Sequence, residues 1–349
     1  MSPVRVTLMQ VAALAGVSKS TASRALINDP RILPTTREAV LKASDELNYH
    51  PNSLARSLKT KKTSMLGIAI NNLQNSTLRE IVERFQELAG DENLQVLLSV
   101  THGNPDEEAR FLDMAIELQL AGVIVAGSGQ NSDRLNRLSA RGISTVSMIR
   151  LVEGAEAHSI LPDYYQSSVL ATQHLISQGH EKISFIGGHK IYTSGRETLK
   201  GFYDTMFASN LRIDESCVHL GPYEPSFGNV AGKKFLETMR ESKVSALIVA
   251  NHEAAHELLP FLAQSKIAIP NELSIICLED AEWFTWWHPP ISAINNRPKE
   301  MAELAFEIIH PKNYGVTNVI TGAENFRLAP ILVERESVGS FENPRRAKK

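Results

Sequence analysis

The chain of 349 residues lacks the features that mark secreted, membrane-spanning and metal-binding proteins. It has only two cysteines, Cys217 and Cys277, each in an apolar stretch and neither at a metal-ligand spacing, so we expect a reducing compartment and no metal site. No apolar run approaches the roughly 20 residues of a transmembrane helix, and the N-terminus has no signal-peptide core. These absences predict a cytoplasmic protein without a membrane partner, and they disfavour an exported solute-binding protein.

Short catalytic motifs are also missing. The sequence has no glycine-rich phosphate loop, no nucleophile elbow and no cluster of metal ligands. Glu279, His252 and Asp280 could still supply acid and base groups to an enzyme with an α/β cleft, so this alternative stays open at this point. The missing motifs favour a protein that is not an enzyme and needs no cofactor.

The sequence does contain a helix-turn-helix pattern in residues 7–26. Apolar residues recur at helical spacing over residues 8–12, Gly16 suits a turn with positive φ, and Ser18 suits the N-cap of a second helix. The second helix of such a motif enters the DNA major groove, where donors and hydroxyls read base edges. A helical hairpin without a DNA role is the alternative. The exposed positions expected on the second helix are Lys19, Ser20, Ser23 and Arg24.

The charge distribution favours the DNA interpretation. Residues 1–62 carry a net charge of +6, and the rest of the chain carries −9. A basic head on an acidic body is expected when one small domain alone meets phosphate. A third predicted helix, over residues 35–47, would complete a three-helix head.

Residues 48–59, NYHPNSLARSLK, are predicted to include a short helix that forms only when another molecule holds it. Pro51 ends what precedes it, and residues 52–59 are too few to be helical alone in water. A partner copy together with DNA could order them, and Leu58 beside small Ala55 suits insertion into a minor-groove base step. A plain linker is the alternative. The polar residues 60–63 that follow predict a domain boundary.

From residue 65 onwards, apolar strands alternate with amphipathic helices, and the pattern restarts near residue 166. This alternation predicts α/β architecture, with two doubly wound units of parallel strands covered by helices on both faces. Such sheets bind ligands at the carboxyl ends of their strands, so we expect a ligand cleft between the two units.

Together, the segments TLMQVAALAGVSKSTASRAL, NYHPNSLARSLK and the paired α/β units resemble the lactose-repressor (LacI/GalR) family of bacterial transcription regulators. The resemblance runs from residue 7 to about residue 337 and implies a body of periplasmic-binding-protein-like (type I) architecture. It further implies a repressor that binds a pseudo-palindromic operator as a homodimer or tetramer. A small-molecule effector, such as a sugar, a sugar acid or a related metabolite, would control DNA affinity from the cleft.

The resemblance also implies domain boundaries. Residues 1–62 would form the DNA-binding headpiece, and residues 63–349 the effector-binding and dimerisation domain. The chain would cross between subdomains near 161–163, 291–295 and 320–324. The N-subdomain would therefore comprise residues 63–161 and 292–322, and the C-subdomain residues 162–291 and 323–340.

Carried over position by position, the resemblance assigns Lys19 and Ser20 to base selection and Leu58 to the minor-groove wedge. The full set of expected DNA-binding residues is Thr7, Ser18, Lys19, Ser20, Thr21, Ser23, Arg24, Asn28, Asn52, Ala55, Leu58 and Lys59.

The expected cleft departs from the family pattern at two positions. Thr198 stands where sugar-binding members usually carry arginine, and His252 stands where they usually carry aspartate. Threonine cannot replace the bidentate fork of an arginine, so the usual sugar-binding mode is in question, and His252 reads either as a pH sensor or as a satisfied structural histidine. The candidate effector contacts are Asn71, Leu73, Asp163, Arg196, Asn251, Glu279 and Trp283.

Overall fold

The computed structural model describes residues 6–49, 64–222, 227–310 and 323–341. The chain divides into two compact units, the headpiece, Met1–Thr63, and the body, Ser64–Lys349. The predicted hinge helix, residues 52–59, lies outside the described residues. In the described part of the chain, no helix combines the length and apolarity that crossing a bilayer requires.

The described part of the headpiece consists of α1 (Leu8–Leu14), α2 (Lys19–Leu26) and α3 (Pro34–Glu46). α1 begins with a capping box, in which the N–H of Thr7 donates to the side chain of Gln10 at 2.8 Å. Gly16 has a φ of 66° in the turn between α1 and α2, a conformation that glycine adopts without strain. The predicted helix-turn-helix is therefore present. Its core is made of small apolar side chains, which are Val11, Ala12, Ala22, Ala25, Val40 and Ala43.

The body contains two α/β lobes, and the first is built on a parallel sheet with the order β11-β5-β4-β3-β1-β2. Its central strands are almost continuously buried, as expected for a sheet with helices on both faces. The strands are β1 (Met65–Ile70), β2 (Gln95–Val100), β3 (Gly122–Ala126), β4 (Ser144–Met148), β5 (His158–Pro162) and β11 (Asn325–Leu328).

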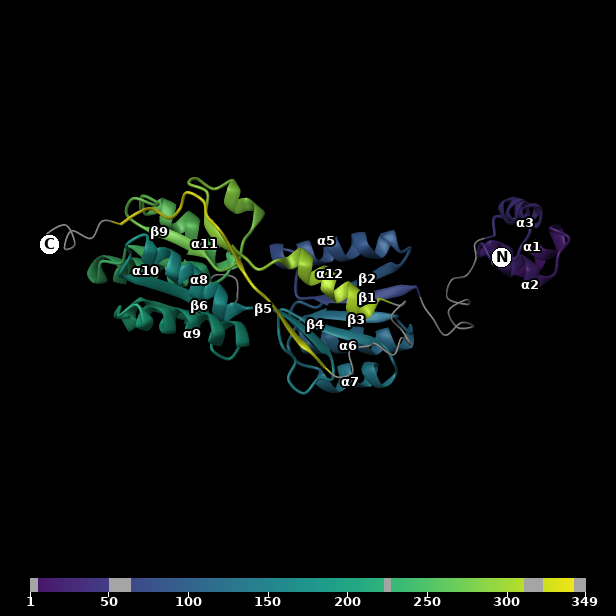
Figure 1. Ribbon diagram of the computed structural model, residues 1–349, viewed down its shortest axis with the longest axis horizontal. Coiled ribbons are helices and arrows are strands. Elements are labelled where there is room, and N and C mark those ends of the chain that lie inside the picture. Colours follow the sequence, from purple (N-terminus) through teal and green to yellow (C-terminus); the bar gives the residue numbers. More distant parts are fainter. Residues whose placement is uncertain (1–5, 50–63, 223–226, 311–322, 342–349) are drawn as a thin grey trace, which may run out of the picture. The chain divides into compact units, whose positions relative to one another are not determined.

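Two pairs of helices cover the faces of this sheet (Figure 1). α5 (Ser76–Asp91) and α12 (Pro298–Ile309) pack on one face, where Phe85 meets Phe306 edge to face with ring centroids 5.8 Å apart. α6 (Pro105–Glu117) and α7 (Ser132–Ala140) pack on the other face. The lobe thus has three layers around two apolar cores.

The second lobe repeats this plan with the strand order β12-β10-β9-β8-β6-β7. All neighbouring strands are parallel except β12, which runs antiparallel to β10. The strands are β6 (Ile183–Gly188), β7 (Val218–Gly221), β8 (Ala246–Val249), β9 (Ser274–Cys277), β10 (Ser292–Asn295) and β12 (Ile331–Val333).

Helices again cover both faces of the second sheet. α8 (Tyr164–Ser177) and α9 (Thr193–Ala208) pack on one face. α10 (Phe227–Ser242) and α11 (His252–Gln264) pack on the other. Two short 3-10 helices complete the described elements of this lobe, namely η1 (Glu215–Cys217) and η2 (Glu282–Thr285). The predicted fold class, a helix-turn-helix headpiece with two doubly wound α/β units, is confirmed.

Within the described residues the chain passes between the lobes three times, and two of the expected boundaries are wrong by a few residues. The first passage lies at Asp163, between β5 and α8. β10 pairs with β9, so residues 292–295 belong to the second lobe and not to the first. β11 pairs with β5, so residues 325–328 belong to the first lobe and not to the second. The sequence of a segment can indicate that it forms a strand. Which of the two sheets the strand joins depends on the neighbouring strand with which it forms hydrogen bonds.

Candidate functional site

The exposed side of α2 carries the polar side chains that were predicted to meet DNA. Lys19, Ser20 and Arg24 are exposed, whereas Thr21 and Ser23 are half-buried. The opposite side of the helix packs into the headpiece core. Within residues 6–49 the structure gives Lys19 and Arg24 no ion-pair partner, so both cations remain available for phosphate or base contacts.

Two other predicted DNA contacts have structural roles at helix ends. The Ser18 hydroxyl accepts a hydrogen bond from the N–H of Thr21 at 3.1 Å and so caps α2. Thr7 caps α1 in the capping box already described. Asn28 is exposed, with a φ of 59°, just beyond the end of α2. The predicted hinge contacts Asn52, Ala55, Leu58 and Lys59 lie outside the described residues.

A cavity of about 510 Å³ lies between the two lobes, at the carboxyl ends of strands from both sheets. It occupies the place where doubly wound sheets bind ligands. Its described lining is mainly polar, with two carboxylates, Glu253 and Glu279, and a single arginine, Arg150. Amide side chains from both lobes contribute, namely Asn71, Asn72, Asn75, Asn251 and Asn296.

Three of the seven candidate effector residues line this cleft, namely Asn71, Asn251 and Glu279. Asn71 follows β1, and its Oδ1 atom is buried without a hydrogen-bond partner in the described part of the chain. Asn251 follows β8 and caps α11, because its Oδ1 accepts from the N–H of Ala254 at 3.1 Å. A buried acceptor without a donor costs free energy, so Asn71 is a natural contact for a ligand hydroxyl.

Asp163 and Leu73 do not line the cleft. The Asp163 carboxylate accepts from the N–H of Gln166 at 2.9 Å and caps α8, which turns the side chain back towards its own helix. The Leu73 side chain is 46% exposed. Asp163 does lie at the expected crossing between the lobes, directly after β5.

Arg196 and Trp283 also lie away from the cleft. The Arg196 guanidinium donates to the carbonyl oxygens of Lys190 and Ile191, at 3.3 Å and 2.9 Å, and so holds the loop before α9. Trp283 lines a neighbouring cavity of about 540 Å³. Neither residue is among those that line the cleft, so their assignment as effector contacts stays a prediction.

Sequence reasoning missed several cleft residues, of which Arg150 and Tyr192 are the most distinctive. Arg150 follows β4 in the first lobe, and Tyr192 precedes α9 in the second. The guanidinium lies 4.6 Å from the centroid of the tyrosine ring, a cation–π contact between the lobes. The position of Arg150 directly after a predicted strand was the available signal. Thr198, noted as a departure from the family pattern, does line the cleft.

A buried carboxylate fixes one wall of the cleft. Glu108 on α6 is fully buried, and its oxygens accept from the N–H and hydroxyl of Ser128 at 2.7 Å and 2.9 Å and from the side-chain amide of Asn131 at 2.9 Å. A Cβ atom on Gly127, which lines the cleft, would lie 1.9 Å from the Glu108 carboxylate. Glycine is therefore required where this loop passes over the carboxylate.

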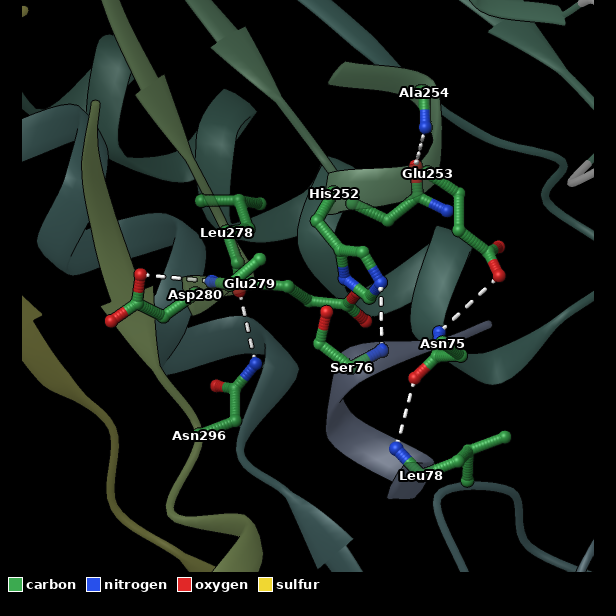
Figure 2. A network of polar contacts seen from close by, with 12 residues as sticks. Asn75, Ser76, Leu78, His252, Glu253, Ala254, Leu278, Glu279, Asp280 and Asn296 are labelled. Atoms are coloured by element: carbon green, nitrogen blue, oxygen red, sulfur yellow. Dashed lines mark hydrogen bonds and ion pairs between the residues drawn. The ribbon is translucent and has the colours of Figure 1, made fainter. Parts of the chain in front are cut away.

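His252 joins the two lobes beside the cleft (Figure 2). Its side chain is 3% exposed, and Nδ1 lies 3.0 Å from Oε2 of Glu279. Its Nε2 atom accepts from the backbone N–H of Ser76, the first residue of α5 in the other lobe, at 3.2 Å. Burial lowers the pKa of His252, but the hydrogen bond to Glu279 and the charges of Glu279 and Glu253 outweigh burial and raise it above 6.5. Both ring nitrogens are satisfied, as the structural interpretation of this histidine expected.

Comparisons with known proteins agree with this architecture at both ends of the chain. Residues 7–52 match the family described as "Bacterial regulatory proteins, lacI family", and residues 172–338 match the "Periplasmic binding protein-like domain". The repressor PurR of Haemophilus influenzae (strain PittEE) is 29% identical over 340 residues, which cover 96% of this chain and 99% of PurR. The chain is therefore similar to the LacI/GalR family over nearly its whole length.

Other relatives extend the likeness to whole structures. PurR of Photobacterium profundum is 27% identical over 95% of this chain and 98% of its own. The lac repressor dimer bound to operator and the anti-inducer ONPF shares the fold with a TM-score of 0.81, at 21% identity over 96% of this chain and all of that chain. The CelR–cellobiose complex matches with a TM-score of 0.67, at 25% identity over 95% of this chain and all of that chain.

The protein is therefore a DNA-binding transcriptional regulator with a small-molecule effector. The whole-chain matches to repressors leave the enzyme alternative without support, because the curated relatives named above are transcriptional regulators. The described residues also contain no group of three histidine, cysteine or acidic side chains placed to hold a metal ion.

Proposed function

We propose that the protein is a repressor that binds a pseudo-palindromic operator as a homodimer and releases or tightens it when a small molecule occupies the cleft. The observation that carries the proposal is the presence, in one chain, of an exposed cationic reading helix and a polar cleft between two lobes. The PurR relatives, which are named as repressors and align over nearly the whole chain, support it.

In this proposal, Lys19 and Ser20 at the start of α2 select base edges. The helix N-terminus and Arg24 contact phosphate, which sets the register of α2 on the duplex without reading sequence. The remaining proposed DNA contacts are Thr7, Ser18, Thr21, Ser23, Asn28, Asn52, Ala55, Leu58 and Lys59.

The proposed effector is an uncharged compound rich in hydroxyl groups, such as a sugar. Amide side chains can donate to and accept from hydroxyls, and the buried Oδ1 of Asn71 accepts no hydrogen bond from the described residues. The carboxylates of Glu253 and Glu279 would repel a sugar acid or a phosphorylated sugar, and the single arginine of the described lining already stacks on Tyr192. We propose that Asn71, Asn251 and Glu279 contact the effector.

The DNA part of the proposal is tested by selecting operators from random duplexes and measuring their binding in mobility shifts at several salt concentrations. A repressor of this type yields a palindromic consensus and binds it about a thousandfold or more tightly than random DNA. Sedimentation of the complex gives its stoichiometry. Binding without sequence preference at every salt concentration would contradict the proposal.

The effector part is tested by a thermal-shift screen of neutral sugars, sugar acids and sugar phosphates. A ligand at about 100 times its Kd stabilises the folded body by about 2.7 kcal/mol, which raises its melting temperature. We expect shifts from neutral sugars only, and loss of the shift in an Asn71→Ala variant. Sugar acids that stabilise the body more strongly than neutral sugars would show that the assigned ligand class is wrong.

A further inference from the structure

Three residues form a continuous hydrogen-bonded chain across the junction of the lobes, which we call the lobe bridge: Ser76, His252 and Glu279 (Figure 2). Ser76 opens α5 in the first lobe, and His252 opens α11 in the second. Glu279 follows β9 and lines the cleft. Ser76 and His252 are 4% and 3% exposed, so water has little access to the link between them.

The backbone N–H of Ser76 determines which nitrogen of His252 carries the hydrogen. The N–H of Ser76 can only donate, so the Nε2 atom of His252 must accept and can carry no hydrogen. The neutral ring then has its hydrogen on Nδ1, which donates to Oε2 of Glu279. The bridge is therefore complete only while the ring is neutral.

We propose that His252 is a positioning residue that couples the effector-facing carboxylate of Glu279 to closure of the lobes, through a bond to Ser76 that exists only without a proton on Nε2. The inference rests on the proposed function in one respect, the assignment of Glu279 as an effector contact. It adds a second input, because protons and effector then act on the same equilibrium between closed and separated lobes.

The groups around His252 make its two bonds respond differently to protonation. Glu279 from the β9 side and Glu253 on α11 favour the charged ring, whereas Arg79 on α5 opposes it. The charged ring keeps its hydrogen bond to Glu279. It then presents an N–H on Nε2 to the N–H of Ser76, at the positive end of the α5 dipole, where a cation is unfavourable. Protonation therefore breaks the cross-lobe half of the bridge and leaves the other half intact.

Other contacts across the junction show where the pH dependence is concentrated. The side-chain amide of Asn75 donates to Glu253 at 3.4 Å, next to the bridge. Arg327 on β11 forms a bidentate pair with Glu197 on α9, at 2.6 Å and 2.7 Å. The hydrogen bond and charge of Glu197 raise the pKa of Arg327, so the arginine keeps its charge near neutral pH. We therefore expect the lobes to separate on the His252 side as the pH falls.

The test measures lobe separation without DNA or effector. Nitroxide labels on Gln86→Cys of α5 and Gln264→Cys of α11 report the distance between the lobes by pulsed dipolar spectroscopy. Both positions are exposed, while the native Cys217 and Cys277 are buried, which directs labelling to the new cysteines. Labelled protein is diluted with unlabelled protein, so that only distances within one chain contribute.

For the otherwise native chain, we expect the ratio of separated to closed molecules to rise about tenfold or more between about pH 8 and about pH 6. Titration of one group limits the change to about tenfold per pH unit, which is about a hundredfold over this interval. His252→Gln, which can form both bonds but cannot titrate, should abolish the change. His256→Gln, four residues along α11 and exposed, is the matched control and should retain it.

A second pair of variants removes the donor and leaves the histidine in place. Ser76→Pro lacks the backbone N–H, and proline is tolerated at the first position of a helix. The preceding Asn75 has a ψ of 117°, which suits a residue before proline. Ser76→Ala keeps the N–H. We expect Ser76→Pro to be separated at both pH values and Ser76→Ala to respond like the native chain.

Unchanged lobe distances in the native chain between the two pH values would overturn the inference, as would a pH response that persists in both His252→Gln and Ser76→Pro. Because neither DNA nor effector is present, these results do not depend on operator binding. If the lobes separate with acid as expected but the chain binds no specific operator, the lobe-bridge inference is supported and the proposed repressor function is contradicted. A chain that binds its operator without any acid-induced separation would do the reverse.

Discussion

The headpiece and the body differ most in what they bury. The described headpiece core consists of valine and alanine, whereas the body buries five phenylalanine rings completely, at positions 85, 185, 202, 235 and 284. A small core of short side chains supplies little transfer free energy, so we expect the headpiece to be the less stable unit. The polar side chains that matter are also placed oppositely, because α2 exposes them to solvent and the body encloses them between its lobes.

This difference teaches that the two units fail in different ways. Loss of packing in the body should leave the DNA-reading surface folded but uncontrolled. Loss of a single cap in the headpiece should weaken DNA binding without affecting the cleft. The four predictions below test this separation, and they run from the largest expected effect to the smallest.

Phe85→Ala should lower the free energy of unfolding of the body by about 4 kcal/mol, because a fully buried ring in contact with Phe306 is replaced by a cavity. The headpiece should be unaffected. Calorimetry of the full chain measures the unfolding of the body. DNA binding, measured at temperatures below the first unfolding transition, reports whether the headpiece is still folded. Equal loss of stability in both units would show that they form a single cooperative unit.

Protonation of His180 at acid pH should destabilise the body and leave the stability of the headpiece unchanged. Its Nε2 donates to the carbonyl of Gly339 at 3.1 Å and its Nδ1 accepts from the hydroxyl of Ser245 at 2.9 Å. Burial lowers the pKa of His180 to about 4, so the unfolded chain, with a pKa near 6.5, binds the proton first. Stability is therefore present above about pH 6.5 and falls by up to about 3 kcal/mol as the pH drops to about 4.

The matched variant for this prediction is His180→Gln, which should unfold more readily at neutral pH but lose stability less steeply with acid. Denaturant titrations at several pH values measure the slope. His180 lies in the body, so headpiece unfolding should lack this component. A variant with the native pH slope would show that another group is responsible.

Lys19→Ala combined with Ser20→Ala should weaken binding to the selected operator by about 2 kcal/mol and relax the preference for the bases that α2 contacts. Lys42→Ala, a charge removal on the exposed side of α3, is the control and should leave base preference unchanged. Repeating the operator selection with each variant measures both outcomes. An unchanged consensus with the double variant would contradict the assignment of these residues to base selection.

Ser18→Ala should destabilise the headpiece by about 1 kcal/mol, because the N–H of Thr21 loses its capping partner. Ser18→Asn, which can cap in the same way, should restore most of the loss. Operator binding measured against temperature reports the effect, and the thermal transition of the body is the internal control. A shift of the body transition would mean that the units are coupled.

The parts of the structure that follow local rules were predicted well from the sequence. The helix-turn-helix followed from spacing, a glycine turn and a cap, and the alternation of apolar strands and helices predicted both α/β lobes. The cleft was predicted only in outline. Asn71, Asn251 and Glu279 line it, but Asp163 caps a helix and Arg196 binds its own loop. A polar side chain can form a hydrogen bond with the nearby backbone or point into a cavity. Which of the two occurs depends on residues distant in sequence, which the spacing of residues along the chain does not reveal.

The sequence by itself determined the reading helix, the class of the body and the position of the cleft, because helical and strand periodicity and caps are properties of short segments. The tertiary structure alone decided which sheet β10 and β11 join, which polar groups meet between the lobes, and that His252 accepts a bond from the far lobe. The physical reason is that these pairings join residues as far apart as Ser76 and His252, and only the folded chain brings such groups within hydrogen-bond distance.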